Sequence, residues 1–300
     1  MNQPLISIIT LNYNQTDTTC AFLESTKKLT YKNYEILVCD MASEKDPTEQ
    51  ISAGNFPNTK VLVSKANLGF SGGNNLGMRQ AHGDFIFIVN NDTEVTPGLL
   101  EALLLPFEED KTIGAVSPKI RFFSQPNVIQ YAGFEPMNFL TGRVFAVGNH
   151  EEDTGQHDIS GYTNSAHGCA MMVKKEVIEK VGMFPENFFL YYEEWDWSAR
   201  MQRAGYHVYY ESKALIFHKE SMSVGKKSKL KLYYLTRNRI LFLRRNSKNK
   251  FQLIAFYIFF TLFSIPKSLI VYTLKGQFSY AGTFTKAVIW NLKNSSHSRV

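Results

Sequence analysis

The chain has 300 residues, 44% of them hydrophobic, which is enough for one large folded unit with an extensive core. Its formal charge of +6 is unevenly spread: residues 1–225 hold 18 Lys/Arg and 27 Asp/Glu, whereas residues 226–300 hold 15 Lys/Arg and no acid. The three cysteines are widely spaced and form no Cys-x-x-Cys pair, which argues against a disulfide scaffold or a cysteine-based zinc site and favours a reducing, cytosolic location.

Short apolar runs alternate with helical patterns in the first third of the chain. The first run begins near the N-terminus with no basic leader before it, so we expect no cleaved secretory signal. Alternating strands and helices predict right-handed βαβ units and an open, mostly parallel sheet. The predicted strands are 5–11, 35–40, 60–64 and 84–90, and the predicted helices are 16–29 and 71–81.

The pattern is less regular after this region, although it stays α/β in character. A helical pattern ends at Gly205, as is typical of a helix C-terminus. The predicted strands here are 115–122, 128–133, 168–174, 208–211 and 214–218, and the predicted helices are 97–107 and 193–204. We therefore expect residues 1–225 to form one α/β domain.

Two loops at one edge of the predicted sheet indicate a nucleotide-diphosphate site. Ligands in such sheets bind beyond the carboxyl ends of the strands, where Asn12, Asp40, Asp92 and the loop 67–75 would meet. The loop 67–75 is rich in glycine, so its backbone N–H groups can approach an anion closely. Asp92 follows a strand, and its carboxylate can hold a divalent cation against the same anion.

Residues 226–300 are predicted to form a basic, apolar helical tail that binds a membrane. An acid-free segment rich in Phe, Ile and Leu favours an anionic lipid surface, and its long apolar runs argue against nucleic acid. The uncharged run 251–265 is followed by Pro266, and fifteen helical residues rise only about 22 Å, less than a bilayer core of about 30 Å. We expect an interfacial or re-entrant helix pair rather than a transmembrane pass, with a soluble core or oligomer face as a third interpretation.

Four motifs, in this order, resemble the family 2 inverting glycosyltransferases, particularly their rhamnosyltransferase-like branch. They are IITLNYN at 8–14, NxGFSGGNNxG at 67–77, GD at 83–84 with NNDT at 90–93, and FLYYEEWD at 189–196. The resemblance covers about residues 5–245. It implies the nucleotide-sugar-binding GT-A fold and transfer of a sugar from a nucleoside diphosphate to an acceptor hydroxyl, usually with Mg²⁺ or Mn²⁺.

The resemblance implies roles for individual residues of the reaction centre. Asp92 would ligate the metal with His218 beside it, and Asn90 stands where the family usually has an aspartate, so metal affinity should be weaker. Glu194 matches the family's catalytic base, with Glu193 as the neighbouring alternative. Carboxylates at the start of a helix are held ionised by its dipole, as a base requires. Asp196, also grouped with the catalytic acids, would pair with Arg200 in a structural or orienting role.

The residue types, together with the resemblance, indicate binding surfaces for the donor and the acceptor. Trp195 and Trp197 would form an acceptor wall, with core packing as the alternative. Arg237, Asn238 and Arg239 would contact a diphosphate or lipid phosphate, or would supply plain membrane-surface charge. The nucleotide-sugar site would comprise Thr10, Asn12, Tyr13, Asp40, Asn67, Gly69, Gly72, Asn74, Asn90 and Asn91.

The expected function is that of a membrane-associated inverting glycosyltransferase in bacterial surface polysaccharide synthesis. Its candidate donor is dTDP-L-rhamnose, and its acceptor would be a glycan on a polyprenyl diphosphate at the cytoplasmic face of the plasma membrane. The alternative is a nucleotide-sugar-binding scaffold subunit with little catalytic activity, which Asn90 favours. The sequence leaves the donor, the linkage and a homo-oligomeric state open.

Overall fold

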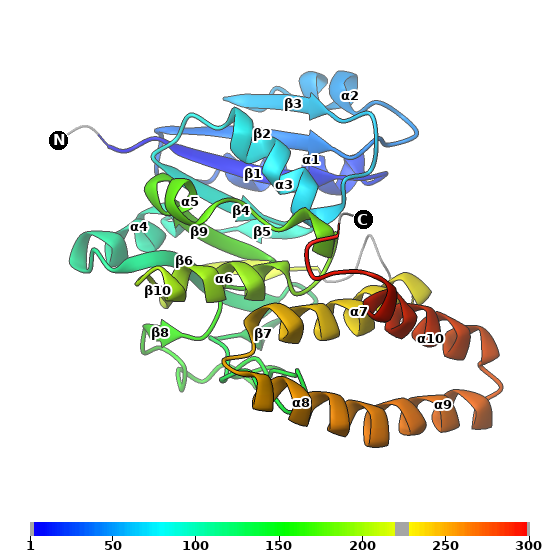
Figure 1. The fold of residues 1–300 in the computed structure, drawn as a ribbon. Coiled ribbons are helices and arrows are strands. Elements are labelled where there is room, and N and C mark those ends of the chain that lie inside the picture. Colours follow the sequence, from blue (N-terminus) through cyan, green and yellow to red (C-terminus); the bar gives the residue numbers. More distant parts are fainter. Residues whose placement is uncertain (1–2, 220–227, 299–300) are drawn as a thin grey trace.

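A single mixed β-sheet forms the centre of the molecule in the computed structural model, which describes residues 3–219 and 228–298 (Figure 1). The predicted boundary at 225/226 lies outside these residues. The sheet order is β3-β2-β1-β4-β9-β6-β10-β5, with β7 beside β6 and β8 beside β10. The strands are β1 (Ile6–Asn12), β2 (Tyr34–Asp40), β3 (Thr59–Val63), β4 (Phe85–Val89), β5 (Thr93–Val95), β6 (Ile113–Phe122), β7 (Gln125–Tyr131), β8 (Gly161–Thr163), β9 (Ala170–Lys174) and β10 (His207–His218).

Helices cover both faces of the sheet, and the helical elements from Lys229 onward form a bundle at one end (Figure 1). The helices are α1 (Thr16–Thr26), α2 (Thr48–Ala53), α3 (Gly69–Gln80), α4 (Leu99–Glu109), α5 (Lys175–Val181), η1 (Glu186–Phe188), α6 (Glu193–Arg203), α7 (Lys229–Asn246), α8 (Lys250–Phe259), η2 (Phe260–Ser264), α9 (Ile265–Leu274) and α10 (Phe278–Lys293). The predicted α/β architecture is confirmed.

The N-terminal half of the sheet is parallel, as the apolar, β-branched runs predict. Strand β1 pairs in parallel with β2 and β4, and β2 pairs in parallel with β3. The register sets Asn12 opposite Asp40, so the ends of β1 and β2 lie together at one edge. One apolar cluster on each face fills the space between the sheet and its helices.

The C-terminal half of the sheet is mixed because β9 runs antiparallel to both β4 and β6. The two short strands predicted at 208–211 and 214–218 are one strand, β10, whose irregularity between Glu211 and Leu215 shifts its register against β6. Strand β5 pairs antiparallel with the end of β10 and sets Thr93 opposite His218. Asp92 is thereby carried next to His218.

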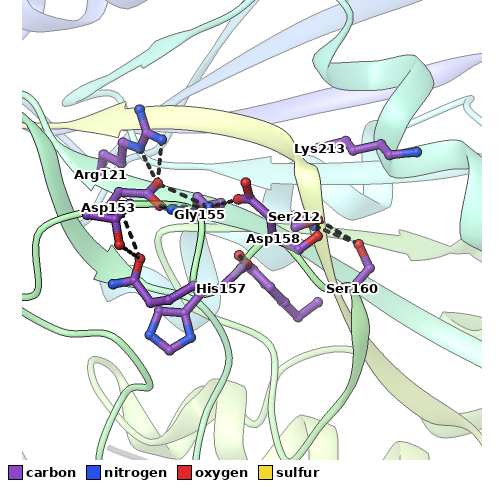
Figure 2. Close-up of polar contacts among 12 residues, drawn as sticks. Arg121, Asp153, Gly155, His157, Asp158, Ser160, Ser212 and Lys213 are labelled. Atoms are coloured by element: carbon purple, nitrogen blue, oxygen red, sulfur yellow. Dashed lines mark hydrogen bonds and ion pairs between the residues drawn. The ribbon is translucent and has the colours of Figure 1, made fainter.

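A buried ion-pair cluster holds the long connection between β7 and β8 on the sheet (Figure 2). Lys119 is 2% exposed and contacts the carboxylates of Asp153 and Asp158. Arg121 Nε donates to Asp153 Oδ2 at 2.7 Å. A buried amine and carboxylate in such contact stabilise each other only while both are present, so this cluster fixes the connection in one conformation.

The tail contains one long helix where two short ones were expected. Elements α8, η2 and α9 join into a continuous helix, Lys250–Leu274, of 25 residues, about 37 Å long (Figure 1). Pro266 does not break it, because the proline lies in the first turn of α9 directly after a π-helical turn, where a missing N–H costs little. Within the described part of the chain this is the one helix long and apolar enough to cross a membrane by length and composition. The expectation of a helix too short to span was therefore wrong.

Candidate active site

A cleft of about 470 Å³ lies at the edge of the sheet where β1, β4 and β10 end. The loop after β4, the start of α3, the start of α6 and the first turn of α7 form its walls. The cleft therefore gathers segments from both ends of the chain. The predicted site residues that line it are Tyr13, Asn67, Gly69, Asn90, Asn91, Asp92, Glu193, Glu194 and His218.

Asp92 and His218 form one side of the cleft. Asp92 Oδ1 lies 3.2 Å from His218 Nε2, and His218 Nδ1 lies 2.8 Å from the side-chain oxygen of Gln130. With Nδ1–H donating to Gln130, Nε2 faces the carboxylate and can donate a proton to it, and a cation bound between the two would take the place of that proton. Burial alone would lower the pKa of His218, but the adjacent Cys169 sulfur and Asp92 carboxylate raise it. Because burial also raises the pKa of the Cys169 thiol, the thiolate contributes little at neutral pH and Asp92 is the effective partner.

The donor set on this side suits a divalent cation that is also bound by a ligand. Within residues 3–219 and 228–298, no three His, Cys, Asp or Glu side chains form a metal-binding cluster. Asp92 and His218 supply one carboxylate oxygen and one imidazole nitrogen, and Asn90 adds an amide oxygen in the same cleft. Mg²⁺ and similar ions are commonly held by one or two protein ligands together with substrate phosphates. The residues therefore fit a metal shared with a diphosphate, not a metal caged by protein alone.

Glu193 and Glu194 also line the cleft, from the first turn of α6. One carboxylate oxygen of each has no hydrogen-bond partner within the described residues. Burial raises the pKa of Glu194 to about 7. Burial and the adjacent Glu194 charge raise the pKa of Glu193 well above its usual value. Because the pKa of Glu194 is raised to about 7, this carboxylate pair at the cleft can take up a proton near neutral pH.

The segment before these glutamates has a strained backbone. Phe189, Tyr191 and Tyr192 all have positive φ angles, of 65°, 71° and 72°, which cost free energy for residues with side chains. Arg237 and Asn238 of α7 hold this segment by donating to backbone carbonyls between residues 187 and 191. These two side chains are buried and fully engaged, so the expected contact with a diphosphate or lipid phosphate does not occur at either. They orient the start of α6 instead.

Asp196 lies outside the cleft, although it is only two residues beyond Glu194. It is 0% exposed, and its carboxylate accepts from Arg245 Nε at 2.8 Å, Asn246 Nδ2 at 2.8 Å and Arg200 Nε at 3.2 Å. Burial alone would raise the pKa of Asp196, but Arg245 and its other partners lower it below the usual value. The structure places Asp196 in a structural junction between α6 and α7 and not among the groups that face the cleft.

Half of the predicted nucleotide-sugar residues lie behind the cleft wall. Asp40 is 1% exposed and accepts from Asn12 Nδ2 at 2.7 Å and from Ser43, and Asn12 in turn accepts from Thr19. Asn91 Nδ2 donates to the Thr19 hydroxyl, so this buried chain of hydrogen bonds reaches the cleft. The predicted nucleotide-sugar residues that do not line the cleft are Thr10, Asn12, Asp40, Gly72 and Asn74.

The glycine-rich motif acts through both its loop and its helix. Gly69 has φ +66°, and an added Cβ would lie 2.5 Å from the carbonyl oxygen of Phe189, so a side chain cannot fit there. Gly72 and Asn74 are buried inside α3, where Asn74 donates to the Phe70 carbonyl. The motif thus keeps the start of α3 in contact with the segment before Glu193.

Neither tryptophan lines the cleft. Trp197 is 0% exposed, donates to the Gly182 carbonyl at 2.7 Å and packs on Phe184 in the core. Trp195 is 6% exposed and packs on Phe134. The structure therefore gives both side chains the core-packing role that was the alternative to an acceptor wall.

Several cleft residues were not expected from the sequence. Gln130 lies on β7, which pairs with β6, and its contact with His218 joins strands 88 residues apart. Cys169 follows His167 just before β9, and Lys231 comes from the first turn of α7. The antiparallel insertion of β9 between β4 and β6 brings Cys169 here, and no local pattern announces that pairing. The polar residues at the end of β7 were the one available signal.

Comparison with known proteins is consistent with this geometry. The model of glycosyl transferase family 2 matches residues 7–182, more than half of the chain. The chain belongs to this family. Its similarity to the N-acetylglucosaminyl-diphospho-decaprenol L-rhamnosyltransferase of Mycobacterium tuberculosis (strain ATCC 25618 / H37Rv) is 24% identity over 247 residues, covering 74% of this chain and 78% of the relative. A shorter match of 92 residues, 33% identical, covers 31% of this chain and 36% of the UDP-Glc:alpha-D-GlcNAc-diphosphoundecaprenol beta-1,3-glucosyltransferase WfgD of Escherichia coli.

Solved structures show that this family 2 glycosyltransferase has the GT-A fold. The mannosyltransferase PcManGT from Pyrobaculum calidifontis, in complex with GDP-Man and Mn²⁺, matches with TM-score 0.59 and 16% identity over 97% of this chain and 81% of that one. GalNAc-T7 with UDP, GalNAc and Mn²⁺ matches with TM-score 0.61 and 16% identity over 77% of this chain. The match spans about half, 48%, of the GalNAc-T7 chain.

Proposed function

We propose that this chain is a membrane-associated, metal-dependent, inverting glycosyltransferase that acts on a lipid-diphosphate-linked glycan. The observation that carries the proposal is that one cleft is lined both by Asp92 with His218 and by Glu193 with Glu194. The first pair suits a departing diphosphate and the second suits an attacking hydroxyl, which are the two requirements of sugar transfer from a nucleoside diphosphate.

The donor would lie between the start of α3 and the loop after β4. Tyr13 is 44% exposed at the cleft and offers an aromatic face to a nucleotide base. Asn67, Gly69, Asn90 and Asn91 line the same side. The Mycobacterium relative supports an L-rhamnose donor such as dTDP-L-rhamnose, whereas the Escherichia relative is named for UDP-glucose, so a panel of nucleotide sugars is the way to choose.

Glu194 would act as the general base. Its free oxygen can take the proton of the acceptor hydroxyl while that oxygen attacks the anomeric carbon from the face opposite the diphosphate, which inverts the anomeric configuration. Glu193 lies beside it and raises the free-energy cost of a second negative charge, which favours proton uptake by the pair. Asp92, His218 and Asn90 would hold the divalent cation. Such a cation neutralises the charge that develops on the leaving diphosphate.

The tail would bring the cleft to the acceptor. The helix Lys250–Leu274 packs on α7 and α10 through Phe256 and Phe260, while its other face leaves large apolar side chains exposed, among them Phe251, Ile254, Ile258, Leu262, Phe263, Ile270 and Leu274. Both relatives are named for acceptors on a polyprenyl diphosphate. We therefore assign residues 1–225 to catalysis and 226–300 to attachment at the cytoplasmic face of the plasma membrane. Leu230 and Lys231 of the tail also reach the cleft.

A scaffold subunit that binds nucleotide sugars without turnover is the second candidate. The observation in its favour is Asn90, an uncharged amide beside the proposed metal ligands. Binding of a nucleotide sugar without hydrolysis or transfer, in the presence of Mn²⁺, would support it.

Glutamate-to-glutamine variants test the proposal. In membranes supplied with Mn²⁺ and a panel of labelled nucleotide sugars, Glu194→Gln should reduce transfer about a thousandfold, because it removes the base but keeps the shape. Glu193→Gln is the matched control and should retain more activity. Retained turnover in Glu194→Gln, with loss in Glu193→Gln, would move the base to residue 193; full activity in both would contradict the proposal.

A further inference from the structure

A buried arginine next to the cleft has no acidic partner. Arg239 of α7 is 9% exposed, and its Nε has no hydrogen-bond partner within the described residues. Its guanidinium lies 4.7 Å from the centroid of the Phe260 ring, a cation–π contact that leaves the N–H groups unused. Burying a guanidinium without an anion is costly, so this arrangement is explained if an anion arrives from outside.

A second arginine adds positive charge at the same place. The backbone of Gly142 lies on the stem of Arg239, since an added Cβ there would be 2.8 Å from Arg239 Cγ, and the next residue is Arg143. Burial and Arg143 both lower the pKa of Arg239, which Tyr192 opposes, to a value of about 10. Across residues 3–219 and 228–298, neither arginine side chain has a hydrogen bond or an ion pair. Two guanidinium groups therefore repel each other with no compensating acid.

The position of this pair relates it to the base and to the apolar helix. Tyr192 stands beside both arginines and also interacts electrostatically with Glu194, two residues along the chain. Its hydroxyl donates to the Gly142 carbonyl at 2.8 Å. On the other side, Phe260 belongs to the long helix whose outer face is apolar. The arginines thus lie between the carboxylates of the cleft and the surface proposed to meet the membrane.

We infer that Arg143 and Arg239 bind a phosphate group of the lipid-diphosphate acceptor. This inference rests on the proposed function. An acceptor of that class has its sugar hydroxyl at one end, its diphosphate next and its lipid chain beyond, which is the order of Glu194, the arginine pair and the apolar helix. Guanidinium groups bind phosphate through paired, charge-assisted hydrogen bonds. Arg237 and Asn238, the neighbours of Arg239, are excluded because backbone carbonyls occupy them.

Binding of a simple diphosphate lipid tests the site without knowledge of the sugar. The full chain in detergent micelles would be titrated with farnesyl diphosphate and, as the uncharged comparison, farnesol. The wild type should prefer the diphosphate, and Arg239→Met and Arg143→Met should each reduce its affinity at least about tenfold while leaving farnesol binding unchanged. The double variant should lose less than the two single losses combined, because both arginines bind one group. Lys267→Met, which removes a charge from the long helix, is the matched control and should bind farnesyl diphosphate as the wild type does.

The headgroup of a membrane phospholipid is the alternative source of the phosphate. Binding to phosphatidylglycerol vesicles, measured beside farnesyl diphosphate binding, distinguishes the headgroup from the acceptor diphosphate. Arg143 is exposed, so Arg143→Met preserves the fold even if Arg239→Met does not. The inference would be overturned if Arg143→Met and folded Arg239→Met both kept the wild-type affinity for farnesyl diphosphate. It would also be overturned if these variants lost only their binding to phosphatidylglycerol vesicles. Such a failure leaves the proposed function standing if Glu194→Gln still abolishes transfer. If Glu194→Gln is fully active, the proposed function fails whatever the arginines bind.

Discussion

The first turn of α6 places three carboxylates in two opposite environments. Glu193 and Glu194 line the cleft, each with one oxygen that has no hydrogen-bond partner among the described residues, and burial raises the pKa of both. Asp196 points away from the cleft, is bonded by Arg245, Asn246 and Arg200, and has a lowered pKa. One short stretch thus holds two acids whose pKa values are raised by burial and a third acid whose pKa is lowered by its arginine partners.

This difference shows that residue type and helix position alone do not predict the role of each acid in the sequence EEWDW. All three acids lie at a helix start, where the dipole favours ionised carboxylates in general. What separates them is the long-range partner: Arg245 and Asn246 come from the far end of α7, about 50 residues later. The paired acid should therefore matter for stability, and the unpaired acids for the reaction.

Removing the proposed metal-binding carboxylate should reduce activity about as strongly as removing the base. Asp92→Ala is expected to reduce transfer about a hundredfold to a thousandfold, since it removes the carboxylate that would hold the cation against the leaving diphosphate. Transfer of labelled sugar at saturating Mn²⁺ measures it. Glu94→Ala, a change of a solvent-accessible acid two residues away that pairs with Lys28, should behave as the wild type. An Asp92→Ala enzyme with more than a tenth of the original rate would exclude a role in the leaving-group site.

Removing the charge of Asp196, the acid that pairs with arginines, should have the largest effect on stability. Asp196→Asn is expected to reduce the free energy of unfolding by about 3 kcal/mol at pH 7, because it leaves the partly buried Arg245 and Arg200 without their anion. The lowered pKa of Asp196 means that its contribution is present above its usual value of 3.8 and is lost as pH falls through the folded value. Urea unfolding at pH 7 and at low pH should show the difference between the two proteins shrinking in acid.

Neutralising Glu194, which has no cationic partner, should change the free energy of unfolding in the opposite direction. Glu194→Gln is expected to stabilise the fold at pH 8 by on the order of 1–3 kcal/mol, because the raised pKa makes the ionised glutamate unfavourable when folded. The gain should vanish near pH 4.5, its usual value, where the unfolded state also begins to hold the proton. If Glu194→Gln and Asp196→Asn changed the free energy of unfolding with the same sign at pH 8, the two environments would not differ as described.

A change at Gln130 should have the smallest effect and tests the orientation of His218. Gln130→Leu removes the partner of His218 Nδ1 while keeping most of the side-chain volume. We expect the apparent affinity for Mn²⁺ to fall about tenfold, as is typical when a ligand histidine loses its orienting contact. The saturated rate should change little. An unchanged Mn²⁺ dependence would argue that His218 is held without Gln130 or does not ligate the metal.

The sequence was a good guide where local pattern and ligand chemistry coincide. The apolar runs 5–11 and 35–40 predict β1 and β2, and the position after β4 places Asp92 at the sheet edge. The motif also placed Glu194 at the start of a helix, where the structure has it lining the cleft. Asp40 shows the limit: its place at a strand end was foreseen, but Ser43 and Asn12 take up its carboxylate behind the wall.

Other features depend on contacts between distant segments, which no local pattern records. Arg237 and Asn238 look like surface charge in the sequence, and only the packing of α7 on the segment before α6 shows that they hold its backbone. The helix through Pro266 continues because a π-helical turn precedes the proline. Trp197 was placed at the acceptor because aromatic side chains suit sugars, but its N–H found a carbonyl in the core.

The pH dependence of kcat/KM tests the role of the unpaired acid most directly. The wild type, assayed in membranes with a fixed labelled donor and Mn²⁺, should lose activity as pH falls through about 7, because the carboxylate pair must be ionised to take the acceptor proton. Glu194→Gln should be far slower and should lack this acid limb. A wild-type profile that stays flat from pH 8 to pH 5.5, or an acid limb that survives unchanged in Glu194→Gln, would contradict the assignment of the base.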